Sequence, residues 1–418
     1  MTSALKSARL NRSLTMRPSY RFREGILSAM FRAAPSMRQR QFSPGIDKIV
    51  ISWEEQAASP SAKSRCDPWK YGSMRRNFIM PDNASLRLYM APMKGFTDWV
   101  YRNTFAEHFH GFDLAVSPFI ASKRDCPVRR RHVRDVWPEN NAGLPVVPQI
   151  LSKVAADFTA LADYLYDMGY ETVNWNLGCP SPMVASKKRG SGLLPYTERI
   201  DAFLEDALSV MKGHLSIKIR LGWSSSAELL RLLPVLNRYP LKEVIIHPRT
   251  GMQAFGGTVD LDAFRQCLTL IDHPVVYNGD IRTLDDFQDL SGRFRDVDTW
   301  MIGRGFLADP FLPDAIRAGR DGSTEKIQRL KRFHGGLFGA YAAVLKGPSH
   351  LLKKMKGLWR YLALSFEPFP QTMKKIKKAT RPEQYLDRVN RFFENEARLA
   401  GDGSAGVETM SRNSLGQG

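Results

Sequence analysis

The sequence predicts an α/β fold, a (β/α)₈ TIM barrel. Short apolar segments alternate with longer amphipathic segments between residues 86 and 311, and such alternation is typical of parallel βαβ units. Eight of these units over roughly 230 residues match the usual barrel of about 250 residues. The alternative is a doubly wound open sheet, but no G-x-G-x-x-G motif follows the first predicted strand. The chain length of 418 residues leaves room for an appendage beside one large barrel.

The predicted strands are all short apolar runs. In chain order they are 86–91 (LRLYMA), 112–116 (FDLAV), 145–150 (PVVPQI), 172–176 (TVNWN), 216–221 (SIKIRL), 243–247 (EVIIH), 274–277 (PVVY) and 299–302 (TWMI). Between them, apolar residues recur at the i, i+3, i+4 spacing of helices, most clearly over residues 155–168 and 199–211. In such a barrel the carboxyl ends of all the strands meet at one rim.

The two ends of the chain differ in composition from the middle. Residues 1–81 are rich in Arg and Ser, poor in acids and without periodicity, which predicts a basic, disordered extension. Organelle transit peptides share this composition, so the expected location is cytoplasmic, with an organelle as the alternative. Residues 399–418 predict a disordered tail, and the barrel is expected within residues 82–320.

The composition excludes several classes of protein. No window approaches about 18 uninterrupted apolar residues, which argues against a membrane-spanning helix. The cysteines form no C-x-x-C pair and have no clustered histidines, which argues against a disulfide scaffold and against a metal site; they are Cys66, Cys126, Cys179 and Cys267. The formal charge is +19, and residues 326–378 hold thirteen Lys and Arg against one Glu. This concentration predicts a polyanionic partner.

Unusual polar motifs follow the predicted strands at their carboxyl ends, where barrel enzymes hold their chemistry. Lys218 and Arg220 lie two residues apart on strand five and therefore share one face. Polar groups inside apolar strands are unfavourable unless they are paired, so their convergence on one rim predicts an active site. The other motifs are Ala91-Pro92-Met93-Lys94-Gly95, Gln149, Asn176-Leu177-Gly178-Cys179-Pro180, His247-Pro248-Arg249-Thr250, Asn278-Gly279-Asp280 and Gly303-Arg304-Gly305.

The last two of these motifs follow strands seven and eight, where barrels commonly bind phosphate. Glycine allows a close backbone approach, and the guanidinium of Arg304 can clamp an oxyanion with two hydrogen bonds. A lone Gly-Arg-Gly is more often a plain turn. Its pairing with Asn278-Gly279-Asp280 in barrel register favours a phosphate site.

Lys218 and His247 each have two interpretations. A buried ammonium at Lys218 could face the electron-rich end of a flavin ring and stabilise its reduced, anionic form. The alternative for Lys218 is a salt bridge to a carboxylate inside the barrel. His247 is either a ligand to the edge of the same ring or a core histidine with satisfied hydrogen bonds.

Cys179 lies in a turn that exposes it at the predicted active rim. A single cysteine is most often an inert, buried residue. An unperturbed thiol, with a pKa of about 8.5, stays protonated at neutral pH and can donate a proton, whereas a nucleophile would need a neighbouring base. The sequence therefore favours a proton donor at Cys179. Cys126 lies in an arginine-rich loop and carries no catalytic prediction.

Five motifs, in the same order, resemble those of the tRNA-dihydrouridine synthases. The resemblance covers about residues 86–393 and implies an FMN-binding barrel followed by a small helical tRNA-binding domain at residues 321–398. It also implies NADPH-dependent reduction of the C5–C6 bond of specific uridines in the tRNA D-loop. The motifs are Ala91-Pro92-Met93 with Thr97-Asp98, Asn176 to Pro182, Lys218 to Gly222, Asn278 to Ile281 and Met301 to Gly305.

The resemblance also implies roles for single residues. Cys179 would protonate C5 as hydride from the flavin reaches C6, with Asn176 and Arg249 near the substrate. The implied flavin contacts are Ala91, Pro92, Met93, Gln149, Lys218, His247, Asn278, Gly279, Asp280, Gly303 and Arg304. Lys94, Phe96, Pro248 and the run Leu193-Leu194-Pro195 depart from the family pattern without removing a cofactor or acid residue.

The basic stretch at residues 326–378 supports an RNA partner independently of the resemblance. Its lysines are expected to contact tRNA phosphates, chiefly Lys353, Lys354, Lys356, Lys374 and Lys375, with Lys377 and Lys378. The aromatic residues among them either stack on bases or, as their helical spacing favours, form a domain core; they are Phe333, Phe338, Tyr341, Trp359, Tyr361 and Phe366. We expect a monomer. The rival hypotheses are an FMN barrel acting on a free pyrimidine or enone, and a catalytically silent RNA-binding protein.

Overall fold

The computed structural model describes residues 85–123 and 128–400. The expectations for residues 1–81 and for the tail beyond residue 400 lie outside these ranges, as do Cys66 and Cys126.

The strands form one sheet in the order β3-β5-β6-β7-β8-β9-β10-β1-β2-β4, with every pairing parallel. Their bounds are β1 (Arg87–Met90), β2 (Leu114–Val116), β3 (Ile120–Ala121), β4 (Val146–Val147), β5 (Gln149–Leu151), β6 (Thr172–Leu177), β7 (His214–Gly222), β8 (Leu241–Thr250), β9 (Val275–Asn278) and β10 (Thr299–Ile302). All eight predicted strands are confirmed, and β3 is an addition that was too short to produce a sequence pattern.

The sheet closes into a barrel because its second and third strands are each made of two pieces. β2 continues into β3 and β4 into β5, and β2 pairs with β4 while β3 pairs with β5. Pro148 separates β4 from β5, since it has no N–H to donate to the ladder. The Ser117 hydroxyl accepts the Gln149 N–H at 3.1 Å across the break. The predicted (β/α)₈ barrel is confirmed.

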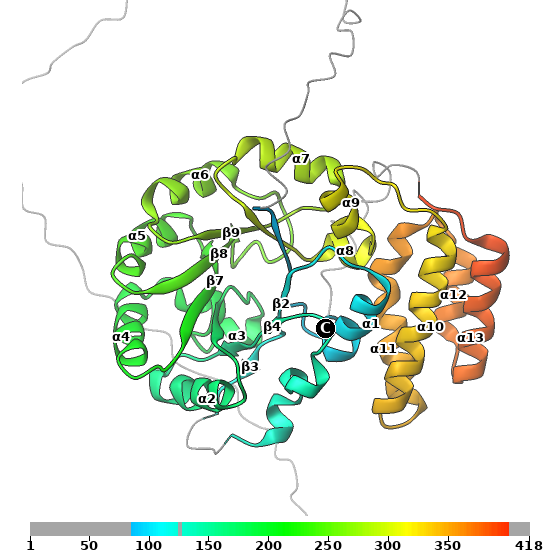
Figure 1. Ribbon diagram of the computed structural model, residues 1–418, viewed down its shortest axis with the longest axis horizontal. Helices are drawn as coiled ribbons and strands as arrows, with labels where there is room; N and C mark the ends of the chain where they lie inside the picture. Colours follow the sequence, from blue (N-terminus) through cyan, green and yellow to red (C-terminus); the bar gives the residue numbers. More distant parts are fainter. Residues whose placement is uncertain (1–84, 124–127, 401–418) are drawn as a thin grey trace, which may run out of the picture. The chain divides into compact units, whose positions relative to one another are not determined.

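Helices surround the barrel and continue beyond it (Figure 1). Around the barrel lie α1 (Trp99–His108), α2 (Ala155–Asp167), α3 (Pro182–Ala185), α4 (Thr197–Leu208), α5 (Ala227–Leu236), α6 (Leu261–Leu270), α7 (Leu284–Arg293), α8 (Arg304–Ala308) and α9 (Leu312–Ala318). The predicted helix at 155–168 is α2. The helix predicted at 199–211 is α4, which ends earlier because the chain turns there towards β7.

Side chains of the strands alternate between two cores, as the pleat requires. On β6, Val173, Trp175 and Leu177 face the helices, and the Trp175 ring stacks on Phe203 of α4 at 3.8 Å between centroids. A second, smaller core fills the cylinder and comprises Tyr89, Ala91, Val116, Val147, Ile245, Val276 and Met301. Polar residues occupy inward positions on both sides of this core: Glu243, near the amino end of β8, accepts the Tyr89 hydroxyl, while Asn176, Lys218 and Asn278 lie nearer the carboxyl ends of their strands.

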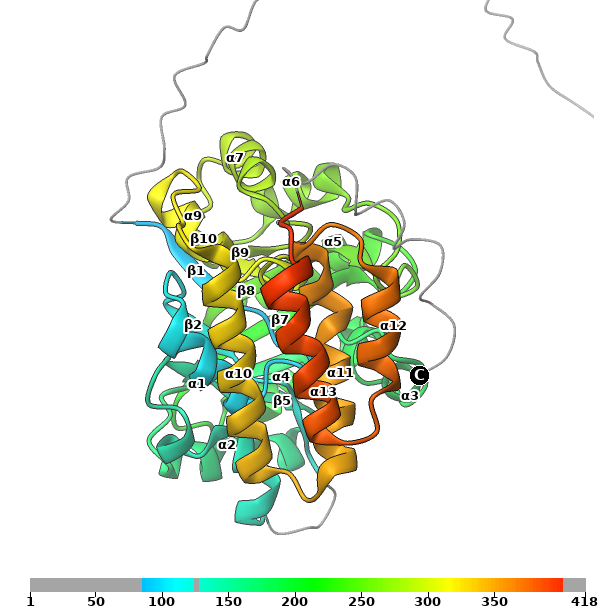
Figure 2. The ribbon, with the colours of Figure 1, turned by 90° about the vertical axis from the view of Figure 1, so that its right-hand side faces the viewer.

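A C-terminal helical region packs beside α1 (Figure 2). It consists of α10 (Lys326–Val344), α11 (Pro348–Leu362), α12 (Pro370–Lys378) and α13 (Pro382–Arg391). Trp359 and His334 each form a 2.8 Å hydrogen bond with the Tyr385 hydroxyl inside it. The core interpretation of the aromatic residues is confirmed for Phe333, Tyr341, Trp359 and Phe366, which are buried. Phe338 and Tyr361 are half-buried.

Candidate active site

The predicted site residues meet at the carboxyl end of the barrel. In the strand register Asn176 lies beside Lys218, Arg220 beside His247, and Asn278 beside Met301. The Arg220 Nε donates to the Gly178 carbonyl at 2.9 Å, so the turn that carries Cys179 lies beside the carboxyl end of β7.

Asn176 shapes the turn that presents Cys179. Its Oδ1 accepts the backbone N–H of Cys179 at 2.9 Å and that of Gly178 at 3.2 Å. Its Nδ2 donates to the Gln149 Oε1 at 2.7 Å. Because both ends of this amide are engaged, Asn176 acts here as a support for Cys179, and its implied contact with the substrate base stays a prediction.

Gln149 continues a chain of buried amides across the barrel. Its Nε2 donates to the Asn174 Oδ1 at 2.8 Å, and the Asn174 Nδ2 donates to the Ser216 hydroxyl at 2.8 Å. Sequence reasoning missed Asn174 and Ser216. Their inward position on β6 and β7, two residues before Asn176 and Lys218, was the available signal.

The Cys179 thiol keeps its proton at neutral pH. Burial raises its pKa, and the N–H of Ser181 and the charges of Lys94, Arg220 and Lys218 offset only part of that rise. A protonated thiol fits a proton donor, as the sequence predicts, and does not fit a thiolate nucleophile.

A short 3-10 helix, Gly190–Leu193, holds the Cys179 backbone in place and was not assigned from the sequence. The Ser191 hydroxyl and N–H donate to the Cys179 carbonyl at 3.0 and 3.1 Å. Gly190 has φ +56, and a Cβ there would lie 2.7 Å from the Cys179 carbonyl oxygen. The glycines of Arg189-Gly190-Ser191-Gly192 were the sequence signal for this close approach.

We expect Gly190→Ala to displace Cys179 and to slow catalysis at least about tenfold, because proton transfer requires the thiol within hydrogen-bond reach. The left-handed backbone adds about 1–3 kcal/mol of instability. Gly169→Ala is the matched control, since Gly169 has φ +96 and open space around its Cβ position. Thermal unfolding should shift in both variants and turnover in Gly190→Ala alone; equal turnover in the two variants would contradict the assignment.

Lys218 lies inside the barrel without a carboxylate partner among the described residues. Its Nζ donates to the Asn278 Oδ1 at 2.7 Å, and the Asn278 Nδ2 donates to the Met301 carbonyl at 2.8 Å. Burial, with the charge of Arg220, lowers the Lys218 pKa to about 7. The salt-bridge interpretation of Lys218 is therefore wrong for the part of the chain that the structure describes.

Asp280 pairs with three arginines at the carboxyl ends of β8, β9 and β10. Its carboxylate pairs with Arg249 at 2.5 Å, Arg304 at 2.9 Å and Arg282 at 3.4 Å. Although burial raises the Asp280 pKa, the hydrogen bond and charge of Arg249 and the charges of the other two arginines lower it overall. Asp280 has φ +43, an uncommon conformation for a residue other than glycine.

Arg249 differs in placement from the predicted substrate contact. Its side chain is 0% exposed, and it donates to the carbonyls of Gly256 and Gly257 at 3.1 and 2.7 Å in addition to Asp280. Its role in this structure is to hold the loop between β8 and α6, so a direct contact with the substrate stays a prediction.

His247 stays neutral in this surrounding. Burial and the charges of Arg220, Lys218 and the nearby arginines lower its pKa well below the ordinary value. Its Nε2 lies 3.3 Å from the Arg249 Nη1, which places the ring proton on Nδ1 when that contact is a hydrogen bond.

The rim residues form a cationic site that fits an anionic cofactor. Burial and the mutual repulsion of these cations lower the pKa values of Lys218, of Arg220 (to about 10) and of His247 together. Among the described residues, Asp280 is the carboxylate that pairs with arginines of this cluster. An electron-rich, phosphate-bearing ring system such as a flavin would relieve this repulsion.

The carboxyl ends of β10 and β1 lie close together at this rim. A Cβ at Gly303 would lie 3.5 Å from the Ala91 Cβ and 3.7 Å from the Met93 Sδ, so the ends of β10 and β1 are in contact distance. Gly303 precedes Arg304, whose Nη2 is held by Asp280. The two predicted phosphate motifs and the Ala91–Met93 turn therefore lie on one side of the rim.

The predicted tRNA-contacting lysines fall into two groups. Lys353, Lys374, Lys375, Lys377 and Lys378 are exposed on α11 and α12. Lys354 and Lys356 are instead engaged within the protein, Lys354 with Asp98 and Lys356 with the Ala379 carbonyl. Their predicted role in tRNA binding is untested by this geometry.

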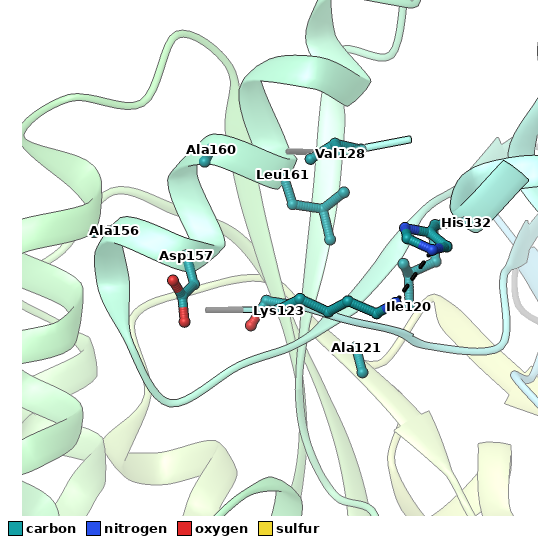
Figure 3. Close-up of a pocket in the computed structure, with 10 residues that line it drawn as sticks. Ile120, Ala121, Lys123, Val128, His132, Ala156, Asp157, Ala160 and Leu161 are labelled. Atoms are coloured by element: carbon teal, nitrogen blue, oxygen red, sulfur yellow. Dashed lines mark hydrogen bonds between the residues drawn. The ribbon is translucent and has the colours of Figure 1, made fainter. Parts of the chain in front are cut away.

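A separate cavity of about 250 Å³ lies between β3 and α2 (Figure 3). His132 and Lys123 meet at its edge, with 3.1 Å between the His132 Nε2 and the Lys123 Nζ. No predicted site residue lines it. Over the described residues there is no group of three metal-ligating side chains, and no helix is long and apolar enough to cross a membrane.

The chain was compared with protein families, curated proteins and solved structures. The family model described as dihydrouridine synthase matches residues 89–398. The tRNA-dihydrouridine(16) synthase of Cupriavidus necator is 28% identical over 57% of this chain and 75% of its own length. That of Aquipseudomonas alcaligenes is 26% identical over 74% of this chain and 99% of its own. Among solved structures, an old yellow enzyme homologue from Zymomonas mobilis aligns with a TM-score of 0.44 at 11% identity, covering 58% of this chain and 91% of that one.

Proposed function

Because the chain belongs to the dihydrouridine synthase family, we propose that it is a flavin-dependent enzyme that reduces uridines of tRNA to dihydrouridine. The observation that carries the proposal is the protonated thiol of Cys179 at the same rim as the buried cation Lys218. A reduction across a C=C bond needs a proton donor and a hydride source. Cys179 suits the first task, and a reduced flavin held beside Lys218 would supply the hydride.

We propose FMN as the flavin and NADPH as the reductant. Arg304, held by Asp280, and the backbone of Gly279 and Gly303 would bind the FMN phosphate. Lys218, His247 and Gln149 would contact the ring, with Ala91 to Met93 along its edge. The sequence holds no recognisable nicotinamide-binding motif, so the choice of NADPH follows from family membership.

The protein's own groups hold and move the proton. When bound, the reduced flavin supplies the hydride for uridine C6. Cys179 holds the proton at Sγ and delivers it to C5, and its raised pKa keeps that proton in place until transfer. Asn176 and Ser191 fix the backbone of the donor from two sides.

The exposed lysines of α12 are proposed to bind tRNA phosphates. Replacing Lys374, Lys375, Lys377 and Lys378 by Gln should lower the slope of log affinity against log salt by about 3, because each phosphate contact contributes about 0.7–0.9. Filter binding of tRNA between low and moderate salt measures the slope. Lys212→Gln, just before β7 at the other end of the barrel, is the control and should leave it unchanged. An unaltered slope in the quadruple variant would place the tRNA elsewhere.

The deciding experiment uses tRNA from cells that lack this protein. Purified protein with FMN and NADPH should form dihydrouridine in that tRNA, and mapping the modified positions identifies the uridine. The relatives named above carry position 16 in their names. Turnover of free uridine without tRNA would favour a small-molecule reductase, and a colourless protein that binds tRNA would favour a silent RNA-binding protein.

We further propose a cytoplasmic monomer. Residues 1–81, which contain few acidic residues, would direct the protein to an organelle if they act as a transit peptide. Imaging the full chain with a carboxyl-terminal fluorescent tag, beside a chain that starts at Met80, separates the two locations.

A further inference from the structure

The loop between β1 and α1 is a single hydrogen-bonded unit. The Thr97 hydroxyl accepts the Met93 N–H at 2.9 Å and lies 3.3 Å from the Ala91 carbonyl. The N–H groups of Phe96 and Thr97 both donate to the Met93 carbonyl, at 2.9 and 3.0 Å. A displacement at Gly95 to Asp98 is therefore passed on to Ala91 and Met93.

One lysine of the C-terminal helical region forms hydrogen bonds with this loop. The Lys354 ammonium, on α11, donates to the Gly95 carbonyl at 2.7 Å and to the Asp98 Oδ2 at 2.6 Å. It also lies 4.7 Å from the centre of the Tyr341 ring on α10. The Lys354 side chain is 15% exposed and that of Asp98 33%, so the ion pair is only partly accessible to water.

Asp98 joins three elements through its carboxylate. Its Oδ1 accepts the Tyr101 N–H at 3.2 Å, which caps α1, and the Tyr341 hydroxyl at 2.7 Å. Its Oδ2 accepts Lys354. The Arg102 guanidinium donates to the Thr97 carbonyl at 2.7 Å from the barrel side, so the loop is held from both sides.

A second contact from α11 reaches the same loop. Tyr361 packs edge-on against Phe96, with 5.0 Å between ring centroids. Tyr361 is also close enough to Arg304 for that charge to oppose the burial-driven rise of the Tyr361 pKa. Apolar packing alone could join the two regions, as Tyr101 and Phe333 do at 5.7 Å. The directional, charged contact at Lys354 adds a defined position for the loop.

We propose that Lys354 is a positioning residue of the active site: with Asp98 and Tyr341 it fixes the β1–α1 loop, and through it the Ala91–Met93 turn, from the helical region. The inference rests on the proposed function only in taking that turn as a flavin contact. The proposed role distinguishes Lys354 from the exposed lysines of α11 and α12, because the Lys354 ammonium donates hydrogen bonds within the protein.

The test compares Lys354→Met with Lys353→Met, which makes the same change of charge one residue away on an exposed position. Without tRNA, Lys354→Met should raise the FMN dissociation constant about tenfold, the effect of losing hydrogen bonds to a charged group, whereas Lys353→Met should not. Hydrogen exchange at the Phe96 and Thr97 amides should speed up in Lys354→Met alone. With tRNA, Lys354→Met should lower kcat, and Lys353→Met should raise KM.

Two further variants keep the result interpretable if Lys354→Met folds poorly. Tyr341→Phe removes one hydroxyl and should give a smaller change of the same kind. In a double-mutant cycle, Asp98→Asn with Lys354→Met should change loop exchange by less than the sum of the two single changes, because each single change already removes the same ion pair.

Unaltered amide exchange and FMN affinity in Lys354→Met would overturn the inference. A wild-type protein that binds no flavin would instead overturn the proposed function, and the exchange measurement would still decide whether Lys354 holds the loop.

Discussion

Replacing Cys179 by alanine is expected to slow dihydrouridine formation by roughly 10²–10⁴-fold while the protein still binds flavin and tRNA. In the proposed mechanism the Cys179 thiol is the proton donor, and its surroundings keep it protonated, since burial raises its pKa more than the nearby cations lower it. Its removal leaves the supports intact, because Asn176 and Ser191 contact the backbone of residue 179 and not its side chain. Single-turnover reduction of tRNA, started from the reduced enzyme, measures the chemical step.

Two controls separate acidity from geometry. Cys179→Ser keeps the shape of the side chain but offers a far weaker acid, so its rate should stay close to that of the alanine variant. The wild-type rate should decrease at alkaline pH, when the Cys179 thiol loses its proton. Because burial raises the pKa of this thiol, the decrease should begin at a higher pH than for an ordinary thiol. Product formation by Cys179→Ala at the wild-type rate would refute the role of Cys179.

Replacing Lys218 by methionine should weaken FMN binding by roughly 10–100-fold, the effect of removing a charged hydrogen-bond donor from a buried site. In the absence of flavin, the same substitution should raise the free energy of unfolding. The reason is that Lys218 is buried beside other cations, which lower its pKa to about 7. Equilibrium titration with FMN and thermal unfolding of the flavin-free protein give the two results.

The pH dependence of both quantities follows from the same shift. Between about pH 7 and the ordinary lysine range, the unfolded chain holds a proton that the folded, flavin-free protein does not, so stability should rise with pH there. The electron-rich end of the flavin ring favours the ammonium form of Lys218, so FMN affinity should fall as pH rises above 7. The FMN phosphate, with a pKa of about 6, stays doubly charged in this window. Neither pH trend should occur in Lys218→Met. If FMN affinity still falls with rising pH in this variant, the pH dependence belongs to another titratable group.

The barrel and its active rim could be predicted from the sequence because both depend on local patterns. Each strand is a short apolar run, and parallel strands bring their carboxyl ends together in whatever order they pair. Cys179, Lys218 and Arg304 therefore meet at one rim once their strands are identified. The sequence did not predict that two barrel strands are each divided, one into β2 and β3 and the other into β4 and β5. The reason is that β3 has only two residues and leaves no recognisable pattern.

Other features of the site depend on contacts between distant residues. The sequence left open whether Lys218 meets a carboxylate, and the fold decided it by placing Asn278 at 2.7 Å. Gly190 and Ser191 approach Cys179 only because the chain folds back on itself after α3.

By itself, the sequence determined the barrel, the rim at which its chemistry lies, the acid Cys179 as a candidate and the basic C-terminal stretch. Only the tertiary structure decided which lysines are free and which are engaged: Lys353 and Lys354 are neighbours with equal charge, yet Lys354 is bound to Asp98. The physical reason is that burial and hydrogen-bond partners come from elements far apart in the chain, which periodicity and composition do not encode.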